Sequence, residues 1–237
     1  MAALQQCCTL LLSGKAKERH DGQTTLRELL EARDDELVTY LDDAGWGRLI
    51  DSFLSSVEHE RAELVAKQLS AIARGRLETR LSQLARDLRT LVDMSCRRLA
   101  PRAVRSILQH AIAVLPLHAD ALCWPLMLDY ARALKTLLMH RPHRDRLVPS
   151  SWECLVQLCA RGLLSRPPGE RERGQPVLQA ALEGELAQLF CVLVTAETVP
   201  LGKHAEALFN FFHSYFGERS SADTSGPGTL KIRQLVV

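Results

Sequence analysis

Two cations, Lys15 and Arg19, fall on the apolar side of the helix that the sequence predicts over residues 15–31. At about 100° per residue, Arg19 lies on the same stripe as Leu26 and Leu30, and Lys15 lies beside that stripe. The opposite side already holds the charges that an amphipathic helix turns to water. Two explanations stay open. Either the alkyl stems cover apolar surface while the charged groups reach water or an acid, or the two cations form a recognition site for a charged partner.

Arginine is also concentrated between residues 74 and 105, where nine arginines meet only three acids. The local excess of six positive charges could bind DNA phosphates or an acidic peptide. The alternative is a solvated helix pair balanced by the acids of residues 28–51. Aromatic residues do not interleave with the arginines, which argues against single-strand binding. The candidate basic surface consists of Arg74, Arg76, Arg80, Arg86, Arg89, Arg97, Arg98, Arg102 and Arg105, with a second basic cluster over residues 132–146.

Motifs for catalysis are missing or incomplete. His143-Arg144-Asp145 matches the start of the H-R-D-L-x-x-x-N loop of protein kinases, but Arg146 replaces the leucine and Ser150 replaces the metal-binding asparagine. We therefore expect this tripeptide to lie in a loop between helices, with its charges in water. The chain has no H-E-x-x-H and no G-x-S-x-G. The sequence predicts no active site, no metal site and no cofactor in this segment.

Charge and cysteine content indicate an ordinary intracellular chain. Thirty Lys and Arg against 28 Asp and Glu give a net charge of +2, so no global field marks the chain as a nucleic-acid or membrane protein. Seven cysteines without C-x-x-C spacing suggest reduced core cysteines, not a disulfide framework or zinc site. The first residues lack a signal peptide, and their leucine run is too short to span a membrane.

Apolar residues recur at helical spacing along most of the chain, and no stretch alternates with period two. Helix starts are predicted near residues 78, 101, 125, 151, 177 and 201, which gives helix pairs of about 47 to 50 residues, close to a HEAT-type period. We expect Pro116 to end the helix that begins at Pro101. An earlier helix carries Trp46 to Val57, and residues 58–75 either continue it or form a charged bridge. The predicted fold is an all-α, HEAT-like α-solenoid of antiparallel helix pairs, with a non-repetitive helical bundle as the alternative.

Several of these segments together resemble the N-terminal region of ATM-type kinases. Residues 15–19, followed by Leu26, Leu29 and Leu30, resemble the family's TAN motif, and Cys7-Cys8 lies upstream much as a cysteine pair does in the vertebrate member. "GWGRLIDSFLSSVEHER", "RRLAPRAVRSILQHAI" and "SSWECLVQLC" resemble the helices that follow, and "LFNFFHSYFGERSS" is similar to a segment of the fungal telomere-length-regulating orthologues. The order and spacing of these short motifs carry the resemblance over roughly residues 5 to 219.

The resemblance implies a very large parent protein, a phosphatidylinositol-3-kinase-like serine/threonine kinase of double-strand-break signalling and telomere maintenance. This segment would serve recruitment and regulation in the nucleus, at chromosomes and telomeres, by binding protein partners such as the break-sensing MRN or MRX complex, with DNA or chromatin contact as a further expectation. ATP and Mg would belong to the kinase domain of a homodimeric parent. The residues that match the motif, and that we expect to bind a partner, are Lys15, Lys17, Glu18, Arg19, Leu26, Leu29 and Leu30.

The resemblance also suggests a division of the chain into three parts. Residues 1–36 form the helical N-terminus with the TAN motif, residues 37–216 the helical solenoid, and residues 217–237 a flexible or truncated tail. The last residues do not resemble the family's continuation, so the chain is expected to be either a fragment of such a kinase or a truncated paralogue. Free-standing helical-repeat adaptors without a kinase, with or without DNA binding, are the alternative class.

Overall fold

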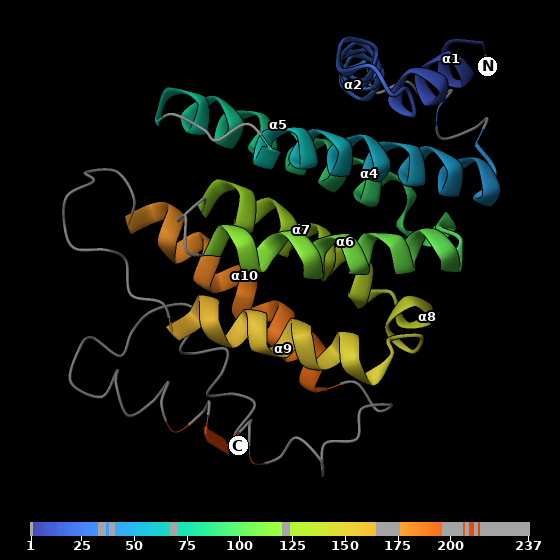
Figure 1. Cartoon of the computed structure of the whole chain (residues 1–237). Coiled ribbons are helices and arrows are strands. Elements are labelled where there is room, and N and C mark those ends of the chain that lie inside the picture. Colours follow the sequence, from blue (N-terminus) through green and yellow to red (C-terminus); the bar gives the residue numbers. More distant parts are fainter. Residues whose placement is uncertain are drawn as a thin grey trace. The chain divides into compact units, whose positions relative to one another are not determined.

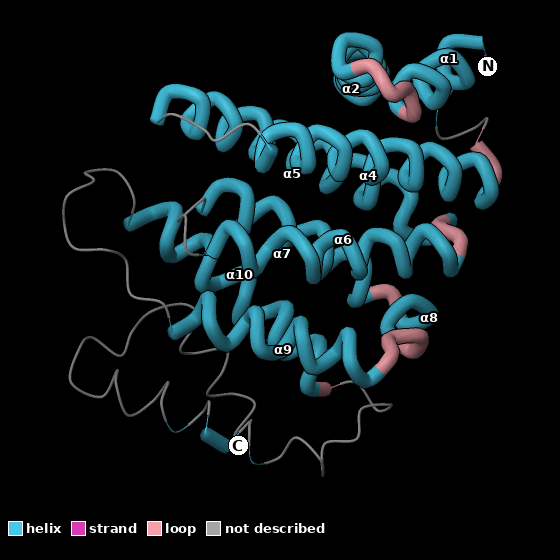
Figure 2. The backbone as a smooth tube through the Cα atoms, viewed as in Figure 1, coloured by secondary structure: helices cyan, strands magenta, loops and turns pink. Residues whose placement is uncertain are grey.

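The regular secondary structure in the described part of the chain is helical. The computed structural model describes residues 2–32, 37, 41–66, 71–119, 124–164 and 176–195, with residues 206, 209, 210 and 213, and it contains no strand in these ranges (Figure 2). The all-α class is therefore confirmed, while the solenoid arrangement stays a prediction. The elements in chain order are α1 (Ala2–Leu11), α2 (Ala16–Glu31), α4 (Asp43–Ala66), α5 (Ala71–Ser95), the 3-10 helix η1 (Cys96–Arg98), α6 (Pro101–Ala119), α7 (Trp124–Met139), α8 (Arg141–Arg144), α9 (Pro149–Leu164) and α10 (Pro176–Val194) (Figure 1).

The chain separates into two compact units, Met1–Ala111 and Ile112–Val237. Helices α1 and α2 pack on each other and contact α4, and α2 also contacts α5, so the segment over residues 1–36 is joined to its neighbours inside the first unit. This grouping differs from the three-part division that the sequence suggested, which stays a prediction.

The first unit is built around the apolar stripes of α4, α5 and α6. Trp46, Leu49 and Ile50 of α4 are fully buried, and the spacing of one turn that the sequence showed places them on a single face. The fully or almost fully buried side chains of the other two helices repeat this spacing; they are Leu84, Leu88, Leu91, Val92, Ala103, Ile107 and Ala111. The long α4 and α5 thus form a base on which the N-terminal helices pack.

Helix boundaries follow the sequence signals closely at most positions. Observed starts at Pro101, Trp124, Pro149 and Pro176 agree with the predicted ones to within two residues, because proline suits the first turn of a helix. Residues 58–66 continue α4, which ends at Ala66, whereas residues 71–75 belong to α5. The predicted helix start near residue 78 is wrong, since α5 already begins at Ala71. The predicted stop at Pro116 is wrong, since α6 runs on to Ala119. A proline in the last turn removes only one backbone hydrogen bond, so the helix can pass through it.

In the second unit, α10 packs against both α7 and α9. The indole Nε1 of Trp152 in α9 donates to the Leu193 carbonyl of α10 at 2.8 Å. Glu185 of α10 accepts from Arg132 and Lys135 of α7, so part of the second basic cluster pairs inside its own unit. Leu134, Leu137 and Leu138 of α7 are fully buried.

The His143-Arg144-Asp145 tripeptide does not lie in an exposed loop. Residues 141–144 form the one-turn helix α8, which has proline in its first turn, and Arg141 pairs with Asp145 at 3.4 Å. His143 is only 4% exposed, whereas Arg144 is partly exposed and Asp145 is exposed, so the charged members of the tripeptide do reach water. The helix predicted after Pro200 and the tail over residues 217–237 lie outside the described residues, apart from four isolated positions. None of the described helices is both long and apolar enough to span a bilayer.

Helices α1 and α2 form a hairpin with very close backbone contact. A Cβ atom built on Gly22 of α2 would lie 2.8 Å from the Leu11 backbone nitrogen and 3.0 Å from the Leu10 Cβ. The Cys7 thiol of α1 lies 3.4 Å from the Gly22 carbonyl and donates to it. Glycine in a helix interior normally costs stability, and here it allows the backbone of α1 to approach α2.

Replacing Gly22 with alanine is expected to lower the free energy of unfolding by about 1–3 kcal/mol, because the added methyl group meets backbone atoms that cannot turn away. Gly75→Ala in α5 is the matched control. A Cβ there meets nothing within 4 Å, so the higher helix propensity of alanine should stabilise the protein by up to about 1 kcal/mol. Urea unfolding of both variants measures the difference, and equal stabilities would contradict the close contact.

Candidate functional site

Arg19, the central cation of the TAN-like motif, is fully buried. Its guanidinium donates to the Ser13 carbonyl at 3.1 Å and to the Gly14 carbonyl at 2.8 Å, both in the turn between α1 and α2. It also forms an ion pair with Glu63 of α4. One side chain therefore ties the α1–α2 turn to α4, and its head group is not available to a partner on the surface.

Lys15 has a different environment from Arg19. It is the residue before the first turn of α2, with an extended backbone (φ −91°, ψ 125°), so its side chain leaves the helix surface. The ammonium group pairs with Glu18 at 2.8 Å, and the Lys15 side chain is 79% exposed. The expectation that Lys15 shares the apolar face is wrong, because the helical spacing that places a residue on a stripe does not hold before the helix begins.

Glu18 accepts hydrogen bonds from two residues at the beginning of α2. Its carboxylate accepts from the Lys15 ammonium and from the Ser13 hydroxyl, while the Ser13 hydroxyl oxygen accepts from the Lys15 backbone N–H at 3.1 Å. These bonds lower the pKa of Glu18 below its ordinary value, with the Lys15 hydrogen bond as the largest cause. An acid in the first turn also suits the positive end of a helix.

The motif residues thus divide into an inner and an outer group. Arg19, Leu26 and Leu30 are buried, Glu18 and Leu29 are partly buried, and Lys15 and Lys17 are exposed. Helix α2, which carries the inner group, packs against α1, α4 and α5. The outer group, on the first turn of α2, is what a partner could contact.

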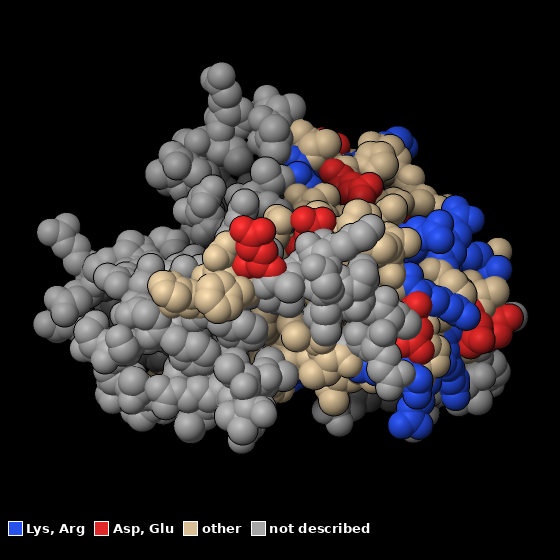
Figure 3. Space-filling view, turned by 90° about the horizontal axis from the view of Figure 1, so that it is seen from below, with Lys and Arg blue, Asp and Glu red and all other residues tan. Residues whose placement is uncertain are grey.

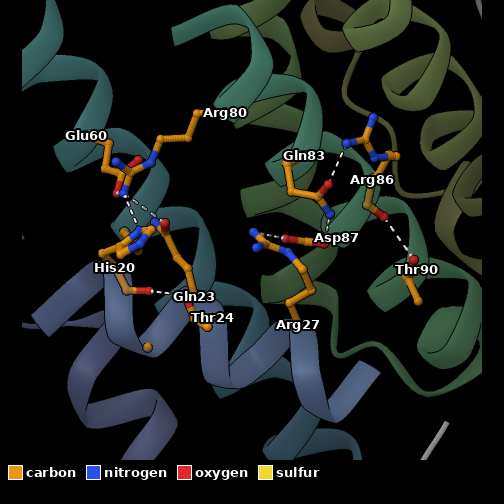
Figure 4. Close-up of polar contacts among 12 residues, drawn as sticks. His20, Gln23, Thr24, Arg27, Glu60, Arg80, Gln83, Arg86, Asp87 and Thr90 are labelled. Atoms are coloured by element: carbon orange, nitrogen blue, oxygen red, sulfur yellow. Dashed lines mark hydrogen bonds and ion pairs between the residues drawn. The ribbon is translucent and has the colours of Figure 1, made fainter. Parts of the chain in front are cut away.

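Further along α2, Gln23 joins a cluster of polar groups between α2, α4 and α5. Its amide nitrogen donates to Ser56 of α4 at 2.6 Å, and its amide oxygen accepts from Arg80 of α5 at 3.3 Å. Arg80 also pairs with Glu60 of α4 and lies 3.1 Å from a ring nitrogen of His20 (Figure 4). Arg80 therefore forms contacts with α2 and α4 inside the first unit, while 39% of its side chain stays exposed.

One turn on, Arg27 of α2 pairs with Asp87 of α5 at 3.3 Å, and Asp87 also accepts from Gln83 at 2.9 Å. Figure 4 shows this group beside the one around Arg80, along the same side of α2. Arg19, Gln23 and Arg27 recur every fourth residue, which places them on one line of the helix. We call these three residues and their partners Glu63, Ser56, Glu60, Arg80 and Asp87 the polar seam.

Burying the charged groups of the polar seam costs free energy, because these groups lose contact with water. Desolvation raises the pKa of Glu60 and of Asp87 above their ordinary values, although Arg80 and Arg27 act in the opposite direction. The Nε atoms of Arg19, Arg27 and Arg80 are buried and find no hydrogen-bond partner among the described residues. Buried ion pairs of this kind contribute little net stability, but the loss of one member leaves the other uncompensated. The seam therefore fixes where α2 sits more than it adds to total stability.

Three of the nine arginines predicted to form a basic surface lie beside acids, and the surface itself stays a prediction. Arg80 belongs to the polar seam, Arg89 pairs with Asp93 at 3.6 Å, and Arg102 lies 3.9 Å from Asp51. Figure 3 shows Lys and Arg side chains gathered at one side of the drawn face with Asp and Glu side chains among them. The positions that remain exposed are Arg76, Arg86, Arg97, Arg98, Arg102 and Arg105, while the side chain of Arg74 lies outside the described residues.

The cysteines within the described ranges are free. Burial raises the pKa of the Cys7 thiol to about 12 and also raises that of Cys159, so both behave as packing residues. Cys154 is exposed, which differs from the expected core position. Among the residues with described side chains, no group of three or more His, Cys, Asp and Glu is placed to hold a metal ion.

The acids of the polar seam were not identified from the sequence. Glu60 lies three residues after Val57 and seven after Phe53, and Asp87 lies between Leu84 and Leu91, so both acids fall on the apolar stripes of their own helices. An acid on such a stripe indicates a buried partner cation. Glu63, three residues after Glu60, could have been found by the same reasoning.

Arg19→Ala is expected to lower the free energy of unfolding by about 2–3 kcal/mol, because it removes the two bonds to the turn carbonyls and the pair with Glu63. A larger loss is not expected, since the Glu63 side chain is 41% exposed and water can solvate it. The control is Lys17→Ala, which should leave the melting temperature unchanged. If both variants melted at the same temperature, Arg19 would not fasten the hairpin.

Arg80→Ala should destabilise the protein most at neutral pH. Without Arg80 the pKa of Glu60 rises further, and an acid with a raised pKa in the folded state costs stability when ionised and regains it as the pH falls through that pKa. The difference in melting temperature from the wild type should therefore shrink as the pH is lowered from 7 through the raised pKa of Glu60. Arg76→Ala, an exposed arginine on the same helix, provides the control, and a difference that grows on acidification would refute the pairing with Glu60.

Comparisons with known proteins show the family of the chain. A family model described as "Telomere-length maintenance and DNA damage repair" (TAN) matches residues 4–153. The chain is 31% identical over 159 residues to serine/threonine-protein kinase tel1 of Emericella nidulans and 27% identical over 163 residues to the protein of the same name from Aspergillus oryzae. Each match covers 66% of this chain but only 6% and 5% of these relatives, and no solved structure matches. The resemblance to the TAN region of ATM-type kinases is confirmed, and the chain belongs to the TAN family of telomere-length maintenance and DNA damage repair.

Proposed function

We propose that this chain is a recruitment and regulatory segment of an ATM-type serine/threonine kinase that signals double-strand breaks and maintains telomeres. The single observation that carries the proposal is the family match over residues 4–153, which includes the α1–α2 hairpin and the whole polar seam. A role in telomere maintenance and DNA repair implies a nuclear location. At chromosomes and telomeres, the segment's partners are proteins of the break-sensing complex, MRN or MRX.

The kinase reaction belongs to the parent protein. The chain spans about one twentieth of the length of the tel1 relatives, whose names describe serine/threonine kinases. ATP and Mg therefore serve a kinase domain of a homodimeric parent, and the contribution of this segment is binding. The arrangement of the motif supports this division of labour, because its charges form contacts that position helices and not a constellation that could move a proton or a phosphoryl group.

Partner contact involves the outer group of the TAN-like motif. With Arg19 buried and paired, the cations that a partner meets are Lys15 and Lys17 at the beginning of α2. Arg19 of the inner group holds this turn in place through the carbonyls of Ser13 and Gly14. A rigid turn presents its exposed cations in a fixed geometry, which reduces the entropy lost on binding.

The test is capture of the purified MRN or MRX complex by the immobilised chain. Lys15→Glu combined with Lys17→Glu should weaken capture at least about tenfold with little change in the melting temperature, because the Lys15–Glu18 pair that it breaks is exposed to solvent. The matched control reverses two exposed cations elsewhere in the first unit, Arg76 and Arg86, and should retain capture. Undiminished capture by the Lys15/Lys17 variant would refute the role of the outer group, and absence of capture by the wild type would refute recruitment through this complex.

A free-standing adaptor would show the same capture but no kinase. Purification of the full gene product under the native promoter separates the two classes, because the proposed parent copurifies with ATP-dependent phosphorylation of serine or threonine. A full-length product without that activity would favour the adaptor.

A further inference from the structure

The cations of the second basic cluster have different surroundings. The two cations of α7 pair with Glu185, and Arg141 pairs with Asp145. Neither Arg144 nor Arg146 forms an ion pair within the described ranges, and the buried Nε of Arg144 has no hydrogen-bond partner there. Arg146 is exposed and Arg144 is partly exposed. These two arginines therefore keep their charge available to a ligand in the segment that joins α7 to α9.

Large hydrophobic residues are exposed on both sides of these arginines. Met139 at the end of α7 is 64% exposed, and Val148 just before α9 is 50% exposed. The other large exposed hydrophobic residues of the described part, Leu12, Val177 and Phe209, lie far from one another in the sequence. Single exposed hydrophobic residues are ordinary, whereas two of them around two unpaired arginines indicate a binding surface. We call this surface the α8 corner, and it consists of Met139, Arg144, Arg146 and Val148.

The backbone of the α8 corner is held by a series of turns. The His140 N–H donates to the Leu137 carbonyl at 3.3 Å, and the N–H groups of His143 and Arg144 donate to the His140 carbonyl at 3.0 and 3.2 Å. The Leu147 N–H donates to the Arg144 carbonyl at 3.0 Å, and the rings of the two histidines contact each other with centroids 4.6 Å apart. A turn that is already formed loses little conformational entropy when a ligand binds.

The length of the α8 corner suits a short ligand. A chain that turns at each step rises at most about 2 Å per residue, so the backbone at Met139 and at Val148 lies within roughly 20 Å. An extended peptide advances about 3.3 Å per residue, and about six residues therefore reach from one end of the corner to the other. Figure 2 shows the loops on both sides of α8 that belong to this segment.

Charge and apolar contact together select the kind of ligand. The guanidinium groups of Arg144 and Arg146 bind anions, and carboxylates accept hydrogen bonds from them. Met139 and Val148 gain from contact with apolar side chains, and methionine adapts its shape to different partners. The phosphate backbone of duplex DNA would satisfy the arginines but would offer nothing to the two apolar residues. A peptide with large apolar side chains among its acids satisfies both groups.

We propose that the α8 corner binds a short acidic segment of a partner protein, with large apolar side chains between the acids of that segment. The surface belongs to the second unit and shares no residue with the TAN-like motif. The proposal therefore goes beyond recruitment through Lys15 and Lys17, and it does not depend on that recruitment.

The experiment measures fluorescence anisotropy of a labelled peptide with the full chain. The peptide consists of about ten glutamates and aspartates, with one phenylalanine and one leucine about five residues apart. Met139→Ser/Val148→Ser and Arg144→Gln/Arg146→Gln should each weaken its affinity at least about tenfold. Both variants should keep the helical circular dichroism and melting temperature of the wild type. If Arg144→Gln disturbs the fold, Arg146→Gln alone should still weaken binding about threefold.

The matched controls remove the same kinds of group elsewhere and should retain the affinity; they are Leu12→Ser/Val177→Ser and Arg76→Gln/Arg86→Gln. Equal losses in the corner variants and the controls would overturn the proposal, as would absence of binding up to about 1 mM peptide. A peptide with serine in place of the phenylalanine and leucine should bind at least about tenfold more weakly.

Equal binding of the serine peptide would reduce the contact to charge alone and would also overturn the proposal. A duplex of about 20 base pairs is the last probe. If the duplex bound more tightly than the peptide and lost its affinity in Arg144→Gln/Arg146→Gln, the α8 corner would be a nucleic-acid site and the proposal would be wrong.

Discussion

The first unit depends on how one buried guanidinium is satisfied. Arg19 has no access to water, so its charge must be compensated by protein atoms, and it obtains two carbonyls from the α1–α2 turn and one carboxylate from α4. Each of these partners constrains a different element. Because the turn, α2 and α4 must all be in place for the charge to be neutralised, the position of the N-terminal hairpin is fixed at a single point.

The remaining contacts extend this constraint along α2. Gln23 and Arg27 repeat the Arg19 pattern one and two turns later, against α4 and α5. Desolvation raises the pKa of Glu60 and Asp87, because burial disfavours their charged forms. On the opposite side of α2, the helix lies close to α1, where Gly22 contacts Leu10 and Leu11 and its carbonyl accepts from the Cys7 thiol. One face of α2 therefore packs closely against α1, and the polar contacts of the other face fix the position of α2 along α4 and α5.

The helices were largely predictable from the sequence, and the polar contacts were not. Proline at the first turn marked Pro101 and Pro149 correctly because this signal is local. The prediction that α6 ends at Pro116 was wrong because proline is tolerated in the last turn of a helix. The prediction that Lys15 lies on the apolar face was wrong because α2 begins just after this residue. The partner of Arg19 lies 44 residues further along the chain, so no local pattern could name it. What the sequence did contain was the anomaly itself, a cation on an apolar stripe, with Glu60 and Asp87 as matching anomalies on other helices.

The division of the TAN-like motif into buried and exposed residues explains how one charged motif can both stabilise the fold and bind a partner. Inner charges hold the turn, and outer charges remain exposed on it. The most direct test of this account is a double-mutant cycle on Arg19 and Glu63, with Arg19→Ala, Glu63→Ala and the double variant compared by urea unfolding. The account predicts a coupling energy of about 1–2 kcal/mol between the two residues. Additive effects, with a coupling near zero, would show that the buried guanidinium does not depend on Glu63 and would contradict the central claim.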